Sequence, residues 1–149
     1  MQGNATQVSR RLHEEHVAVI ALCGKLEASL SAGKSDPALL KAALEAIDGE
    51  VERHFAFEEA ELFPRMNEAG EGDLVDLLLE EHAAVRDAAR RFAAAARQVP
   101  PGADLRPAGL EFAERLASHA QKEEMSMLPA LDDLLDAGTD ADLILAYAG

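Results

Sequence analysis

The chain has little of what disulfide-bonded, membrane-spanning and β-sheet proteins require. It contains a single cysteine, Cys23, so no disulfide can form within the chain. No window approaches the roughly 18 uncharged apolar residues that a transmembrane helix needs. Residues that favour strands are scarce, and no segment alternates between apolar and polar positions. These absences favour a helical protein, and a cytoplasmic location is the default expectation for a chain without disulfides.

Positive charge is also scarce. The chain has 14 Lys and Arg against 28 Asp and Glu, which gives a formal charge of −14. Phosphate backbones and anionic lipid surfaces repel such a chain, so we expect no nucleic-acid partner and no membrane partner. The pair Arg10 and Arg11 is not followed by an apolar stretch, so it does not indicate an export signal. The length of 149 residues indicates one domain, covering residues 1–149.

Leu, Ala and Glu dominate the composition, and all three favour helices. The spacing of the apolar residues follows a helical period. Helices are expected over about 6–30, 37–62, 73–98 and from 104–107 to about 129. Pro64 is expected to end or kink the second helix, and a short extra helix with Thr139 as its cap is expected near the C-terminus. Long helices joined by short polar turns predict an all-α, antiparallel up-down-up-down four-helix bundle. It would consist of two helical hairpins, about 6–68 and 73–136.

The feature that carries chemistry occurs twice. Residues 54–64 read H-F-A-F-E-E-A-E-L-F-P and residues 119–129 read H-A-Q-K-E-E-M-S-M-L-P. Each is preceded, roughly forty residues earlier, by E-E-H followed by V-A-V or A-A-V. The copies are offset by 66 residues for the first His and by 65 for the second. A duplicated set of metal-binding residue types predicts a site with two metal ions, one for each half.

The spacing explains how these side chains could meet. Residues four apart lie on the same face of a helix, so His54 lies beside Glu58 and His119 lies beside Glu123. His16 and His82 could reach the same level of the bundle from the other two helices. Imidazole and carboxylate together suit iron, manganese or zinc, and a carboxylate has two oxygens with which to bridge two ions. The alternative is a duplicated helical scaffold whose polar core holds no metal.

The pattern resembles the hemerythrin-like, or HHE cation-binding, domain family, whose motif is H…H-x-x-x-E…H…H-x-x-x-E. The resemblance covers nearly the whole chain. It implies a four-helix bundle with two non-haem iron ions, bridged by two carboxylates and an oxo or hydroxo group. Carried onto this sequence, it assigns His16 and His54 to one iron, His82 and His119 to the other, and Glu58 and Glu123 to the bridge. Manganese or zinc is the alternative metal.

The chain departs from the oxygen-carrying members that it resembles. Those proteins have a second His one turn from the His of the third helix, whereas Leu79 and Arg86 occupy the flanking positions here. A site with one imidazole fewer leaves more open metal positions. This departure favours reaction with peroxide or nitric oxide, or looser metal binding, over stable oxygen carriage.

Other residues near the motif have roles that the sequence leaves open. His13 could be a further ligand, a donor to a ligand, or a partly exposed residue. Four Glu residues adjoin the motif and would either orient ligands or face solvent: Glu15, Glu59, Glu81 and Glu124. Tyr147 would more readily pack a terminal helix than bind metal. Phe55, Phe57 and Phe63 are expected to shield the site or fill the core, and Cys23 to be buried.

Two functions follow from these expectations. The first is a di-iron protein that reacts with small oxidants such as O2, peroxide or NO, with peroxide consumption as its enzymatic form. The second is a sensor of oxygen or NO, or an iron-binding module, that acts through a partner protein without turnover. Outward Leu and Ala positions would also allow a homodimer.

Overall fold

The computed structural model describes residues 5–148, and its regular elements are all helices. The expected all-helical class is therefore confirmed. The first helix, α1, spans Gln7–Ser31. The side chain of Thr6 accepts the N–H of Ser9 at its start, and Gly33, with a φ of 75°, follows its end. A positive φ is a conformation that glycine adopts without steric cost, so the chain can turn there.

The second helical run is longer than the sequence predicts. It comprises α2 (Pro37–Ala46), η1 (Ile47–Val51), α3 (Glu52–Phe57), η2 (Glu58–Leu62) and α4 (Phe63–Glu68). The segments η1 and η2 are π-helical turns on either side of α3. Pro64 was expected to break or kink this helix near Leu62, but the helix continues to Glu68. Pro64 lies in the first turn after η2, where its missing N–H is tolerated.

The second half of the chain follows the expected boundaries closely. Helix α5 spans Gly72–Ala96, α6 spans Leu105–Met125 and α7 spans Met127–Leu134. The backbone leaves the helical conformation only at Ser126, so α6 and α7 form one interrupted run. The expected C-terminal helix is present as α8 (Ala137–Ala148). Its cap differs from the expectation, because the Asp136 carboxylate accepts the N–H of Thr139.

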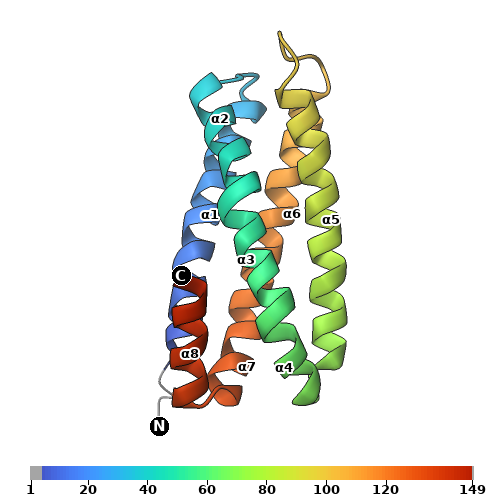
Figure 1. Ribbon diagram of the computed structural model, residues 1–149. Helices are drawn as coiled ribbons and strands as arrows, with labels where there is room; N and C mark the ends of the chain where they lie inside the picture. The colour runs from blue at the N-terminus through green and yellow to red at the C-terminus, as the bar shows by residue number, and fades with distance from the viewer. Residues whose placement is uncertain (1–4, 149) are drawn as a thin grey trace.

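Figure 1 shows the four long runs side by side, with α8 lying along the lower half of α1. Contacts join α1 to α6, α5 to α6, α4 to α5, and α8 to α1. Asp140 of α8 accepts the backbone N–H groups of Gln7 and Val8 at 2.9 and 3.0 Å, so the last helix caps the first. No helix among the described residues is long and apolar enough to cross a membrane.

Two hydrophobic clusters fill the interior. One includes Leu26, Leu40 and Phe92 towards the α2 end, and the other includes Leu12, Met66 and Leu131 towards the α7 end. Buried His and Glu side chains lie at the level between them. Burying charged groups is costly unless they are paired or bind a metal, so this polar layer is where function is expected.

Candidate metal centre

Six polar side chains meet in the middle of the bundle. His16 comes from α1, His54 from α3, Glu58 from the first position of η2, and His82 from α5, while α6 supplies His119 and Glu123. None is more than 6% exposed, and both Glu residues are fully buried. All six residues proposed from the sequence therefore converge, from all four long runs.

The two carboxylates lie between the imidazoles. The Glu58 oxygens lie 2.8 Å from His54 Nε2 and 3.0 Å from His82 Nε2. The Glu123 oxygens lie 2.8 Å from His16 Nε2 and 2.9 Å from His119 Nε2. Each Glu thus presents one oxygen to a His of the first half and one oxygen to a His of the second half. This is the arrangement that a carboxylate bridging two ions requires.

The six residues form two overlapping groups, each compact enough to hold a metal ion. The first consists of His16, His54, Glu58 and Glu123, and the second of His82, His119, Glu58 and Glu123. Within each group the ligand atoms lie within 4.8 Å of one another. Both groups share the same two Glu residues, so two ions held here would be adjacent.

One pair of atoms fits a metal better than it fits the protein alone. His119 Nε2 and Glu123 Oε2 are buried, and neither has a hydrogen-bond partner among the described residues. They lie 2.9 Å apart without the geometry of a hydrogen bond. Buried polar atoms without a partner are costly in a folded protein, whereas a cation would be a partner for both. The donor set, imidazole nitrogen with carboxylate oxygen, matches iron, manganese or zinc.

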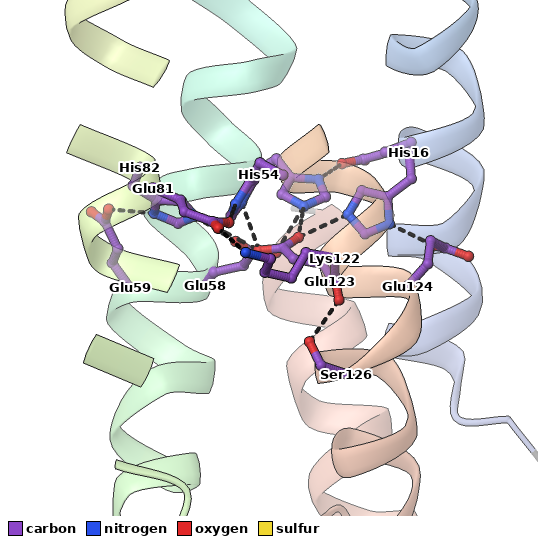
Figure 2. A network of polar contacts seen from close by, with 12 residues as sticks. His16, His54, Glu58, Glu59, Glu81, His82, Lys122, Glu123, Glu124 and Ser126 are labelled. Atoms are coloured by element: carbon purple, nitrogen blue, oxygen red, sulfur yellow. Dashed lines mark hydrogen bonds and ion pairs between the residues drawn. The ribbon is translucent and has the colours of Figure 1, made fainter. Parts of the chain in front are cut away.

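A second layer of Glu residues holds the four imidazoles from outside, and Figure 2 labels Glu59, Glu81 and Glu124 of this layer. Glu124 accepts from His16 Nδ1 at 2.6 Å and Glu15 from His54 Nδ1 at 2.8 Å. Glu59 and Glu81 accept from the Nδ1 atoms of His82 and His119, each at 2.7 Å. Each Glu therefore supports a His of the next long run, around a closed cycle. These bonds place a proton on Nδ1 and leave Nε2 facing the centre.

The outer Glu residues are themselves held by donors. Arg86 donates to Glu59 at 2.6 Å, Tyr147 donates its hydroxyl to Glu15 at 2.6 Å, and Lys122 contacts Glu81. His13 lies 2.6 Å from Glu124, with 57% of its side chain exposed. His13 is therefore a neighbour of the outer layer and does not join the central six. Arg86, at a position where a further His was considered, supports Glu59 instead.

The electrostatics favour positive charge at the centre. Burial disfavours imidazolium, but the carboxylates outweigh it and raise the pKa of His54, His119 and His82, the last to about 9. Burial likewise opposes ionisation of Glu123, yet the four imidazoles around it hold its pKa well below the usual range. The same field that stabilises protons on the imidazoles would stabilise metal cations in their place.

The surroundings of the two halves differ. Phe55 stacks on His82 with ring centroids 3.8 Å apart, and Phe63 lies 5.4 Å away. Ala120 occupies the matching place in the other half of the repeat. A cavity of about 20 Å³ lies there, lined by His16, His54, His119 and Glu123 with Val19, Leu116 and Ala120 among its apolar walls. That volume suffices for one water-sized molecule.

Several details were not foreseen from the sequence. The repeated E-E pairs were a usable signal for the outer layer, because each half retains the second Glu. Nothing in the pattern indicated Lys122 or the contact of Tyr147 with Glu15. Cys23 is buried as expected, in an apolar cluster where burial raises the pKa of its thiol to about 12.

Comparison with known proteins agrees with this geometry. Neither a curated protein nor a solved structure shows significant similarity to the chain. The family model described as the hemerythrin HHE cation-binding domain matches residues 7–131. That range includes all six central residues and the four outer Glu residues. The chain therefore belongs to the hemerythrin HHE cation-binding domain family.

Proposed function

We propose that this protein binds two iron ions and reacts with small oxidants at the pair. His16 and His54 would hold one ion, His82 and His119 the other, and Glu58 and Glu123 would bridge both. The observation that carries the proposal is the sharing of both central Glu residues by two compact ligand groups. The bundle would be one domain of two antiparallel hairpins, which gives each ion one His from each helix of its own hairpin.

The outer Glu residues prepare the imidazoles for metal. Each accepts the Nδ1 proton of one ring, which orients the ring and makes its Nε2 a stronger electron donor. Nε2 must lose its proton to bind a cation, and the central Glu residues must be ionised, so binding of metal would release the Nε2 protons to solvent. Bound iron would supply the one-electron steps and open positions that reaction with O2, peroxide or NO requires.

The protein also limits what can approach. The cavity beside His16 and His54 admits a molecule of about the size of water, and its walls at Val19, Leu116 and Ala120 are apolar. Phe55 also forms part of the cavity wall, and its ring stacks on His82. We infer that a small neutral oxidant approaches the ion held by His16 and His54, and that larger substrates are excluded.

Metal content and the ultraviolet–visible spectrum test the proposal first. We expect about two irons per chain after anaerobic ferrous reconstitution, and charge-transfer bands after exposure to oxidant. Glu58→Gln should lose this stoichiometry, while Glu68→Gln, an exposed position on α4, should retain it. Absence of bound metal in the reconstituted protein would contradict the proposal.

Titration with peroxide and NO then separates turnover from binding. Peroxide consumption faster than with an equal amount of free iron would identify the protein as an enzyme. A reversible spectral change without consumption would identify a sensor or an iron-binding module instead.

A further inference from the structure

Helix α8 lies outside the stretch that matches the family model, yet it contacts the outer Glu layer of the metal centre. The match ends at residue 131, and α8 spans Ala137–Ala148. Its first turn is anchored to α1, because the buried Asp140 accepts the N–H groups of Gln7 and Val8. Its last turn carries Tyr147, which is 8% exposed. The helix is therefore fixed near both of its ends.

Tyr147 is held in a defined orientation. Its ring stacks on Phe57 with centroids 4.3 Å apart, and the guanidinium groups of Arg11 and Arg53 lie 5.2 and 5.5 Å from the ring centroid. Its hydroxyl donates to Glu15 Oε1 at 2.6 Å. Burial and this hydrogen bond raise the pKa of Tyr147 to about 12, so the hydroxyl remains a donor at neutral pH.

The oxygen that Tyr147 contacts is the one that holds a central imidazole. Glu15 Oε1 also accepts from His54 Nδ1 at 2.8 Å. In the other half, Glu81 uses Oε1 for His119 and Oε2 for Lys122, whose side chain is 40% exposed. The two halves therefore differ in how their outer Glu is secured. In one half a buried phenol acts on the shared oxygen, and Arg11 donates to the opposite oxygen, Glu15 Oε2, at 3.0 Å. In the other half the half-exposed Lys122 acts on the opposite oxygen of Glu81. The difference between the halves is therefore the phenol at the shared oxygen.

We propose that Tyr147 is a positioning residue for the metal ion held by His16 and His54, acting through Glu15 on the His54 ring. The inference rests on the proposed function. It follows that docking of α8 controls how firmly that one ion is retained. Retention of the ion at His82 and His119 does not depend on α8.

The test compares Tyr147→Phe with Leu145→Ala, an exposed position of the same helix that is 72% exposed. The Phe variant retains the ring that packs on Phe57 and removes only the hydroxyl. In the metal-free protein, we expect Tyr147→Phe to move the ring nitrogen NMR signals of His54 and to leave those of His82 and His119 in place. In the two-metal protein, a chelator should remove the ion at His16 and His54 several-fold faster and the other ion at the unchanged rate. The effect should stay below the roughly 10–100-fold typical for a direct partner of a ligating His, because Tyr147 acts through Glu15. Leu145→Ala should match the unaltered protein in both measurements.

A second measurement uses the fact that Tyr147 is the only tyrosine. Uniform incorporation of 3-fluorotyrosine labels this position alone, and its fluorine signal should shift when the ion at His16 and His54 binds. An unchanged fluorine signal, unmoved His54 signals, or equal acceleration of both ions would each overturn the inference. If the unaltered protein bound no metal, the proposed function would fail. The effect of Tyr147 on metal retention would then fail with it, whether or not the His54 signals moved. If Tyr147→Phe bound two ions and released both at the rates of the unaltered protein, this inference would be contradicted and the proposed function would stand.

Discussion

The two halves of the centre are nearly identical in their ligands and unlike in their surroundings. Each half supplies two His, one central Glu and two outer Glu, and the distances from Nδ1 to the outer Glu span only 2.6–2.8 Å. Around them, Phe55 in one half stands where Ala120 stands in the other. The repeat thus keeps the groups that would hold metal, while the apolar neighbours differ between its copies. Under the proposed function, the repeated groups would determine what is bound, and the neighbours would determine which ion an oxidant can reach.

The central carboxylates offer the largest expected effect, because both halves share them. We expect Glu123→Ala to abolish binding of both ions, since it removes an oxygen from each ligand group. His119→Ala should instead weaken mainly the ion at His82 and His119, and His54→Ala mainly the other. Metal content after reconstitution measures all three. Retention of two ions by Glu123→Ala would show that the halves do not share a bridge.

Exchange of the apolar neighbours tests the difference between the halves directly. We expect Ala120→Phe to fill the cavity of about 20 Å³ and to slow reaction with peroxide or NO strongly, with both metals still bound. Phe55→Ala should open space over His82, enlarge the same cavity, and lower the free energy of unfolding by about 3–5 kcal/mol, the usual cost of removing a buried Phe. Stopped-flow spectra and denaturant unfolding provide the measurements. An Ala120→Phe protein that reacts at the original rate would place the approach of the oxidant elsewhere.

The outer Glu residues should show a smaller and graded effect. We expect Glu59→Gln to weaken the ion at His82 by about 10–100-fold, because it weakens the bond that orients the His82 ring. Arg86→Met should have a lesser effect in the same direction, since it removes only the donor that holds Glu59. Competition with a chelator measures both. A control is Arg90→Met, whose side chain is 71% exposed.

The smallest effect is a pH dependence of the metal-free protein. The pKa of His82 is raised from 6.5 to about 9, so its protonated form stabilises the fold fully below about pH 6.5. That contribution is lost as the pH rises through 9, and His54 and His119 shift in the same direction. We therefore expect the metal-free protein to lose stability between pH 6.5 and 9. Binding of metal should reduce this loss, because the ions replace the protons, and thermal unfolding at several pH values would measure both.

The helical class and the central six residues were accessible from the sequence for local reasons. The i to i+4 spacing places His54 beside Glu58 and His119 beside Glu123 in any helix, and the duplicated E-E-H supplies the two remaining His. The course of the second run was predicted less well. Pro64 suggested an early end, and the π-helical turn that accommodates it has no signal in single-residue propensities.

The sequence alone determined the family and the residue types that gather at the centre. Helical periodicity and the repeated motif can each be read from short stretches of the chain. Only the tertiary structure decided which Glu supports which His, since those partners lie up to 108 residues apart. It also decided the contact of Tyr147 with Glu15 across 132 residues and the cavity beside His16. Such contacts depend on how helices are rotated and offset against one another, which packing of the whole core settles.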